Sequence, residues 1–190
     1  MDKVAIFIDG AYLGKVLKET YGAPKIDFSK LSSHLANGIS ILRTYYYNCM
    51  PYKSKTPSSG EIARYNGMQK FVTSLEQLDR YEVKLGKLEY RGRKVDGSPI
   101  YQQKRVDILL GCDLVLLAAK QRIGKAILVT GDSDFIPAIQ IAKNEGVEIE
   151  LVYDTTHAPH NSLTLIADER KILTQADIDA VKFTATGAGT

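Results

Sequence analysis

Short apolar runs alternate along this chain with longer segments in which apolar residues recur at helical spacing. The runs are rich in β-branched and aromatic residues and predict buried strands. The predicted strands span Val4–Ile8, Ile39–Tyr47, Tyr81–Tyr90, Ala126–Thr130 and Val147–Tyr153. The predicted helices span Ile26–Leu35, Glu61–Leu78, Val106–Lys120, Phe135–Asn144 and Ser162–Ala167. This alternation predicts an α/β fold in which helices cover both faces of a central, mostly parallel sheet.

The 190 residues have the length of a single domain, and no repeat or long linker divides them. We predict one domain over residues 1–180 and a flexible C-terminal tail over residues 181–190. The two cysteines are too few for a disulfide framework. Asp107 and Asp113 interrupt the longest apolar stretch, and the apolar run after Met1 is too short for a signal peptide. These features favour a cytoplasmic protein without a membrane span.

Positive charge is concentrated in one segment of the chain. The net charge is +3, yet residues 84–105 alone carry +5, because seven basic residues there face only two acidic ones. We interpret the first part of this region, Tyr81–Tyr90, as a strand or a strand-turn-strand unit. The following Arg91–Gln103 contains Gly and Pro and is predicted to be a loop or a hairpin.

Two of the predicted strands end in acidic residues. Asp9 follows the first strand, and Asp132 and Asp134 follow the fourth. In open parallel sheets, ligands bind at the carboxyl ends of the strands, where the strand order reverses. A third acidic position, Asp107, begins the helix after the basic segment. Clustered carboxylates repel one another unless a cation offsets their charge, and such oxygen ligands suit Mg²⁺ or Mn²⁺.

Each acidic residue also has a purely structural interpretation. Asp9-Gly10 is a common turn dipeptide, and Asp132 is a good N-cap for the helix that follows it. Asp107 is favoured in the first turn of a helix by the helix dipole. Asp113 lies six residues further, on another face of that helix, where we expect a buried acid that bonds to the backbone or supports the site.

Three motifs together resemble a known family. They are Phe7-Ile8-Asp9-Gly10, then Lys104-Arg105-Val106-Asp107, then Thr130-Gly131-Asp132-Ser133-Asp134-Phe135. In this order they resemble the NYN domain of the LabA-like group, which belongs to the PIN-like nuclease superfamily, and the resemblance extends over residues 4–166. It implies a three-layer PIN-like (Rossmannoid) fold and metal-dependent cleavage of RNA. It also implies that Asp9, Asp107, Asp132 and Asp134 are the catalytic and metal-binding residues. The chain departs from the family at Tyr12, where many NYN domains have Asn.

The basic segment is consistent with an RNA substrate. The residues that we predict to contact the backbone of single-stranded RNA are Arg91, Arg93, Lys94, Lys104 and Arg105. Tyr90 and Tyr101 are available for base stacking. The alternative is a hairpin whose charges only keep it in solution. The resemblance also allows a homodimer, because PIN-like domains often pair.

We therefore expect a Mg²⁺- or Mn²⁺-dependent ribonuclease, with a binding module for RNA or protein on the same fold as the alternative. Other enzyme classes fit less well. A haloacid-dehalogenase phosphatase needs an acid at the position of Ala11, and no G-x-G-x-x-G follows the first strand. Asp132-x-Asp134 also matches a glycosyltransferase pattern, but no nucleotide-binding region accompanies it. His157 and His160 form an H-x-x-H pair with too few further ligands for zinc.

Overall fold

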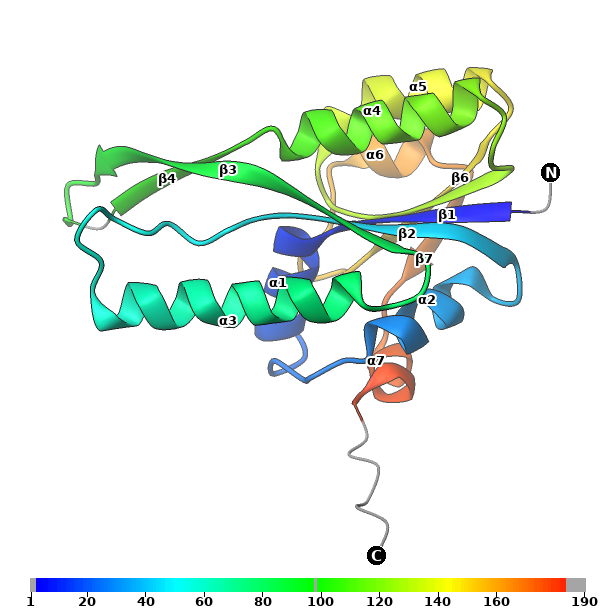
Figure 1. Cartoon of the computed structure of the whole chain (residues 1–190). Coiled ribbons are helices and arrows are strands. Elements are labelled where there is room, and N and C mark those ends of the chain that lie inside the picture. Colours follow the sequence, from blue (N-terminus) through cyan, green and yellow to red (C-terminus); the bar gives the residue numbers. More distant parts are fainter. Residues whose placement is uncertain (1–2, 98, 184–190) are drawn as a thin grey trace, which may run out of the picture.

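A seven-stranded sheet runs through the protein in the order β4-β3-β2-β1-β5-β6-β7 (Figure 1). The computed structural model describes residues 3–97 and 99–183, without side-chain detail at Gln103 and Lys104. The strands are β1 Lys3–Asp9, β2 Ser40–Cys49, β3 Tyr81–Arg93, β4 Pro99–Lys104, β5 Lys125–Val129, β6 Glu148–Tyr153 and β7 Glu169–Ile172. Neighbouring strands pair in parallel, except β3 and β4, which form an antiparallel hairpin.

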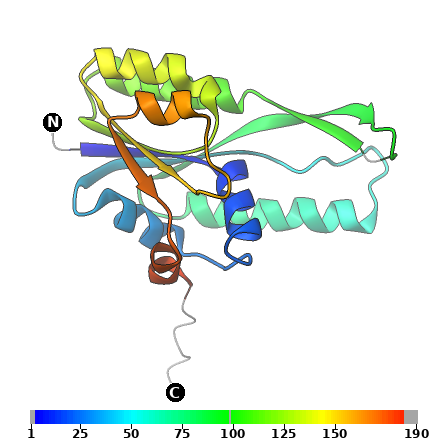
Figure 2. The same ribbon diagram turned by 180° about the vertical axis from the view of Figure 1, so that it is seen from behind.

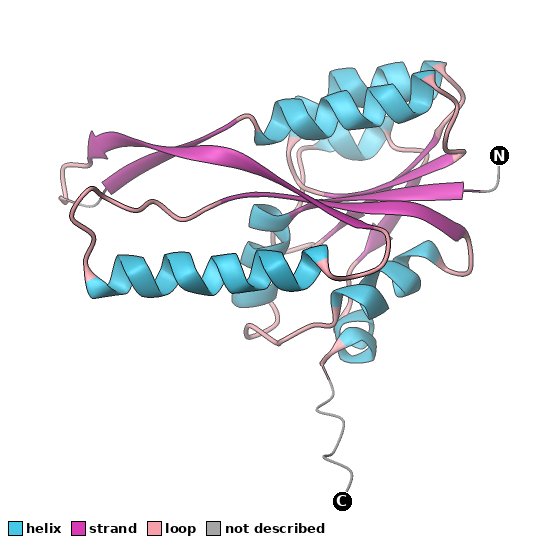
Figure 3. Cartoon of the chain, viewed as in Figure 1, coloured by secondary structure: helices cyan, strands magenta, loops and turns pink. Residues whose placement is uncertain are grey.

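Helices cover both faces of the sheet and make it the middle of three layers (Figure 3). They are α1 Gly10–Glu19, α2 Phe28–Ala36, α3 Ser59–Glu76, α4 Val106–Ala119, α5 Ile136–Asn144, α6 Asn161–Ile166 and α7 Gln175–Val181. Apolar residues of α4, α5 and α6 form the core on one face. Those of α1, α2, α3 and α7 form the core on the other. The fold class expected from the sequence is confirmed, and within the described residues no helix is long and apolar enough to cross a membrane.

The central strand β1 shows why its sequence is a continuous apolar run. Val4, Ile6 and Ile8 enter the core below α1 and α2, whereas Ala5 and Phe7 enter the core below α4. All five side chains are fully buried. A strand covered on both faces needs apolar residues at every position, and this requirement removes the alternation typical of a half-exposed strand.

Three elements were not predicted from the sequence. The Asp9-Gly10 dipeptide is not a turn, because Asp9 is the N-cap of α1 and the helix begins at Gly10. The strand β7 is polar and pairs only with β6, so it lacks an apolar signal. The helix α7 begins with a capping box between Thr174 and Asp177, a signal that was present in the sequence.

The C-terminal segment lies against α2. Of the tail expected over residues 181–190, Val181 ends α7 and is buried, and the N–H of Phe183 donates to the carbonyl of Lys25. Residues 184–190 lie outside the described residues.

A long projection extends from the carboxyl edge of the sheet (Figures 1 and 2). Pairing between β2 and β3 ends at Gly86, but β3 continues to Arg93 and pairs there with β4. The loop over residues 50–58 follows the same direction. We refer to this loop together with residues 87–104 as the arm. The segment expected to be a loop or a hairpin is therefore a hairpin.

Candidate functional site

The strand order reverses between β1 and β5. From β1 the chain adds β2, β3 and β4 on one side, and then returns to add β5, β6 and β7 on the other. The carboxyl ends of β1 and β5 therefore flank the position where open α/β sheets bind their ligands. Asp9 is the last residue of β1, and Asp132 follows shortly after β5.

Asp9 uses one carboxylate oxygen to begin α1. Its Oδ1 accepts hydrogen bonds from the N–H groups of Ala11 and Tyr12, at 3.0 and 3.1 Å. The hydroxyl of Thr130, directly after β5, donates to Oδ2 over 3.4 Å. Burial raises the pKa of Asp9, the charge of Asp107 adds to this effect, and the two amides oppose it. The residue thus caps a helix and still presents a second oxygen toward β5.

Asp132 and Asp134 lie in the turn after β5. The Thr130 hydroxyl accepts from the N–H of Asp132, at 3.1 Å, which sets the direction of the turn. The Oδ1 of Asp132 accepts from the N–H of Asp134, at 2.9 Å, and caps the short 3₁₀ helix η1, Ser133–Phe135. The structural interpretation of Asp132 as an N-cap is therefore correct, yet it leaves Oδ2 without a hydrogen bond from any described residue.

Asp107 is brought to the same edge by α4. It lies in the first turn of this helix, directly after Arg105 and Val106. Desolvation raises its pKa, and the charges of Asp132 and Asp134 raise it further. Arg105 has a φ of 77°, a left-handed conformation that costs energy for a residue with a side chain. The strain occurs where the arm joins the acidic residues.

The four carboxylates come from three separate segments, and their charges interact: those of Asp132 and Asp134 raise the pKa of Asp107, and that of Asp107 raises the pKa of Asp9. No Lys or Arg side chain that the structure describes forms an ion pair with them. Their oxygen atoms match what Mg²⁺ or Mn²⁺ prefers, so the donor chemistry fits such an ion. Within the described ranges, however, no group of three or more acidic, His or Cys side chains is already close enough to hold a metal.

An open cavity of about 660 Å³ lies between α1 and the loops after β5 and β6. Asp9 and Asp132 line it, together with Tyr12, Lys15 and His157. Lys15 is exposed and forms no ion pair with a described residue. Sequence analysis did not identify Lys15, because it did not predict α1. Apolar residues at positions 13, 16 and 17 carried the missing helical signal.

Tyr12 connects the three segments around the cavity. Its hydroxyl donates to the carbonyl of His157 and accepts from the N–H of Asp154, both at 3.0 Å. Its ring lies so close to Gly131 that a Cβ at that glycine would be 2.6 Å from a ring carbon. Burial raises the pKa of Tyr12 to about 12, so its hydroxyl keeps its proton. Tyr12 is thus a positioning residue in this chain.

The loop after β6 depends on a buried acid. Asp154 is 1% exposed, and its Oδ1 accepts from the N–H groups of Thr156 and His157. The Nε2 of His157 lies 3.1 Å from a carboxylate oxygen of Glu19, whereas His160 bonds to Ser162 at the start of α6. The two histidines have different partners, and no described residues join them in a zinc site.

Asp113 belongs to a separate network on the same helix as Asp107. It accepts from the hydroxyl of Tyr47, at 2.8 Å, and forms an ion pair with Lys84, at 2.7 Å. Lys84 also pairs with Glu82. The partners of Asp113 are thus side chains and not the backbone groups of the first alternative considered from the sequence. This acid is compensated, unlike the four at the carboxyl edge.

The predicted RNA-binding residues are spread along the arm. Arg91 bonds to Gln102 and pairs with Glu89, and Arg93 donates to the carbonyl of Gly97. Lys94 is exposed in the turn of the hairpin. Lys104 ends β4, and Arg105 follows it next to α4. These residues form a row that leads away from the acidic edge rather than one compact patch.

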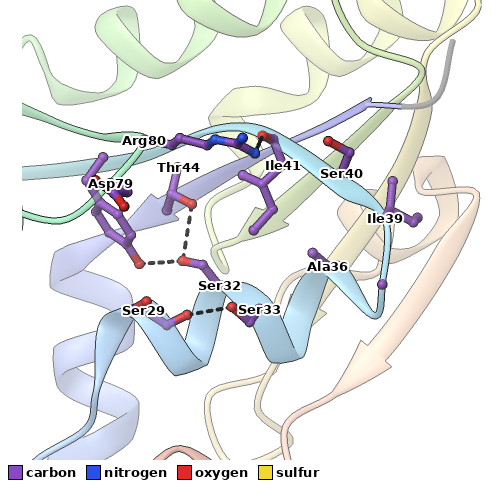
Figure 4. A pocket seen from close by; sticks show the side chains of 12 residues that line it. Ser29, Ser32, Ser33, Ala36, Ile39, Ser40, Ile41, Thr44, Asp79 and Arg80 are labelled. Carbon is purple, nitrogen blue, oxygen red and sulfur yellow. Dashed lines mark hydrogen bonds between the residues drawn. The ribbon is translucent and has the colours of Figure 1, made fainter.

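A second cavity, of about 490 Å³, lies at the amino end of β2 and β3 (Figure 4). Its hydroxyl groups bond to one another, because Ser32 contacts both Tyr81 and Thr44. The guanidinium group of Arg80 donates to the carbonyl of Ile41 at 2.7 Å. Since these polar groups already have partners, we assign this cavity no chemistry.

Comparisons with known proteins agree with the fold. Over 80 residues the chain is 34% identical to the uncharacterized protein y4oD of Sinorhizobium fredii (strain NBRC 101917 / NGR234). This alignment covers 42% of the chain and 33% of y4oD, so the chain matches about a third of that protein's length. The crystal structure of VPA0982, a protein of unknown function from Vibrio parahaemolyticus RIMD 2210633, shares the fold with a TM-score of 0.64. At 19% identity, over 93% of this chain and 95% of that one, this likeness concerns the fold alone.

The family assignment rests on nearly the whole chain. Residues 3–172 match the NYN domain, and this range includes all four carboxylates and the arm. The family is typically ribonucleolytic and generally uses divalent metals. The three motifs, the reversal of strand order at β1 and the acidic edge are therefore features of a chain that belongs to the NYN domain family, a PIN-like nuclease family.

Proposed function

We propose that this protein is a Mg²⁺- or Mn²⁺-dependent ribonuclease. One observation carries the proposal: Asp9, Asp107, Asp132 and Asp134 converge on one edge of the sheet without a compensating cation among the described side chains. Carboxylates that only cap helices do not need to meet at one place. Mutual repulsion lowers the stability of the folded chain, so a bound cation gives this arrangement a physical reason.

The carboxylates would hold the ion through oxygens that capping leaves available. Asp9 and Asp132 each retain Oδ2, and the charge of Asp107, in the first turn of α4, interacts with both carboxylates. A divalent ion bound there supplies Lewis-acid chemistry for phosphodiester hydrolysis. Lys15, which lines the cavity with Asp9, and Arg105, which precedes α4, would each neutralise a phosphate of the RNA. Tyr12 keeps the loop after β6 in place beside the substrate.

A binding module with little or no cleavage activity is the second candidate. It is favoured by the absence, among the described residues, of a ready group of three metal ligands. It is also favoured by Tyr12, because its hydroxyl is already occupied by two backbone groups. This reading predicts RNA binding that does not depend on a metal.

The decisive experiment is cleavage of a 5′-labelled, unstructured RNA with Mg²⁺ or Mn²⁺. The variants are Asp9→Asn and Asp132→Asn, and Asn retains the ability to cap a helix. Glu145→Gln is the matched control, because Glu145 is an exposed carboxylate after α5, away from the acidic edge. We expect metal-dependent cleavage by the wild type and the control, and cleavage slower by roughly 100-fold or more in the two Asp variants.

A second readout does not depend on activity. If the carboxylates bind Mn²⁺, the ion should raise the unfolding temperature of the wild type, since a ligand at 100 times its Kd adds about 2.7 kcal/mol of stability. Asp9→Asn should show a much smaller rise, and Glu145→Gln the full one. Equal rises in all three proteins would contradict the metal site. Binding of RNA without cleavage in either metal would support the second candidate.

A further inference from the structure

Three tyrosines form a cluster on the arm, in which Tyr90 and Tyr101 are exposed and Tyr52 is half-buried. Tyr52 comes from the loop over residues 50–58, Tyr90 from β3 and Tyr101 from β4. Their ring centroids lie 5.8 Å apart for Tyr52 and Tyr90, 5.3 Å for Tyr52 and Tyr101, and 6.1 Å for Tyr90 and Tyr101. Tyr90 is 43% exposed and Tyr101 is 42% exposed. We refer to these three residues as the tyrosine cluster.

The hydrophobic core does not account for this cluster. None of the three rings belongs to either core on the two faces of the sheet. None of their hydroxyl groups forms a hydrogen bond with the part of the chain that the structure describes. The cluster therefore presents aromatic surface to the solvent at a place where burial of apolar area contributes little to the fold. Nucleobases are ligands that bind such surfaces by stacking.

The cluster lies on the face of the sheet from which α4 begins. Tyr90 and Tyr101 are directly opposite each other in the hairpin, so both point to one face. Side chains alternate along β3, and this places Tyr90 on the same face as Lys84, which pairs with Asp113 of α4. The first turn of α4 carries Asp107. A strand that leaves the acidic edge on this face would thus reach the cluster.

The net charge around the arm and the distance from the sheet to the tyrosine cluster both suit a bound nucleic acid. Residues 50–105 carry twelve basic and six acidic residues, whereas the rest of the chain has a net charge of −3. Tyr90 lies four residues beyond Gly86, the last residue of β3 that pairs with β2. At about 3.3 Å per residue this is about 13 Å, or about four nucleotides at the spacing of a stacked strand.

We propose that the tyrosine cluster is a stacking platform for the bases of single-stranded RNA that extends from the acidic edge. The platform rests on the proposed function for its substrate, but it makes a separate claim about binding. Arg93 and Lys94, at the end of the hairpin, contact the phosphates of the stacked segment. The platform tolerates different bases, because stacking uses the faces of the bases rather than their edges.

The test is equilibrium binding in EDTA, which prevents metal-dependent cleavage. The probes are a fluorescein-labelled 12-nucleotide oligouridine and an abasic strand of the same length and charge. The variants are Tyr52→Ala and Tyr90→Ala, with Tyr90→Phe as the control that keeps the ring. Ile100→Ala controls for loss of apolar surface, since Ile100 is exposed on the opposite face of the hairpin.

We expect each Tyr→Ala variant to bind oligouridine 5- to 100-fold more weakly, a range on the order of the loss of one stacked base. Binding of the abasic strand should already be weak in the wild type and should change little in the variants. Tyr90→Phe and Ile100→Ala should bind as the wild type does. Circular dichroism of each variant checks that the chain is folded.

The outcomes separate the platform from the nuclease. If the Tyr→Ala variants bind oligouridine normally while Asp9→Asn abolishes cleavage, the platform is wrong and the nuclease stands. If the variants lose binding but the wild type never cleaves, the platform stands and the nuclease is wrong. If Tyr90→Ala changes the oligomeric state and leaves RNA affinity unchanged, the cluster is a contact between copies of this chain, and the platform is overturned.

Discussion

Acidic residues at the two ends of the sheet have opposite electrostatic environments. At the amino end, Lys125 lies 2.7 Å from Glu150, 2.5 Å from Glu169 and 3.1 Å from Glu148. Hydrogen bonding to Lys125 lowers the pKa of Glu169. At the carboxyl end, burial and neighbouring negative charge raise the pKa of Asp9 and of Asp107.

This difference helps to separate structural acids from functional ones. The glutamates around Lys125 hold β5, β6 and β7 together, and their charges are offset within the chain. The aspartates at the other end have no such partner among the described side chains, and the cation of the proposed function would offset their charge. Perturbed acids in a cavity are functional candidates for this reason. If the distinction is correct, substitutions at the carboxyl end should change mainly activity, and substitutions at the amino end should change mainly stability.

The largest effect that we expect is on activity at the carboxyl end. Asp9→Asn should lower RNA cleavage roughly 100-fold or more, since it removes a ligand of the proposed ion. Its free energy of unfolding should stay within about 0.5 kcal/mol of the wild type or rise, because Asn also caps helices and repulsion with Asp107 is removed. Cleavage assays and urea unfolding measure the two quantities. A strongly destabilised variant would show that Asp9 is structural.

The converse is expected at the amino end. Lys125→Met should lower the free energy of unfolding by about 3 kcal/mol, because three glutamates would lose their common partner in a partly buried site. Cleavage per folded molecule should be unchanged. Urea unfolding, followed by cleavage assays below the transition, measures both. If Lys125→Met lowered cleavage per folded molecule as strongly as Asp9→Asn does, the two ends would not be functionally distinct.

Between these extremes lies Tyr12. Tyr12→Phe removes one hydroxyl that bonds to Asp154 and His157. We therefore expect the free energy of unfolding to fall by about 1–3 kcal/mol. Hydrogen exchange of the amides of Thr156 and His157 should become faster, whereas exchange in the strand β6 should not. Exchange that rises equally throughout the protein would indicate global destabilisation instead of a released loop.

The smallest effect concerns another compensated carboxylate. Burial alone would raise the pKa of Asp177, but bonds from Thr174 and His34 lower it to about 2. A carboxylate with a lowered pKa stabilises the fold above its unfolded pKa of about 4 and loses this contribution as the pH falls toward 2. Stability measured against pH should therefore decline over this range, and Asp177→Asn should flatten the decline. An unchanged slope would contradict the assignment.

Much of the fold follows from local sequence patterns. The buried strands were recognisable as continuous apolar runs, and α3, α4 and α5 as periodic segments. The helix α1 was missed, because Gly10 after Asp9 also suits a turn. Its glycine has a tertiary reason: a Cβ at Gly10 would lie 2.3 Å from the ring of Tyr46. Such a contact between β2 and α1 leaves no local signal.

The candidate site was likewise predicted only in part from the sequence. Its acidic residues were identified from motifs in the sequence, since each lies at the end of a strand or the start of a helix. Lys15 and the role of Tyr12 were not, because both depend on the cavity between α1 and the loop after β6. The partner of Asp113 was also unexpected, since Lys84 lies 29 residues away along the chain.

The sequence by itself determined the order of the buried apolar strands along the chain, the family motifs and the positions of the acidic residues. Local periodicity and capping chemistry are sufficient for these, because they depend on residues a few positions apart. Only the tertiary structure decided which charges are offset and which are not, and which tyrosines gather on the arm. Electrostatic compensation and ring contacts depend on distances in space, and the chain folds together segments that its sequence keeps far apart.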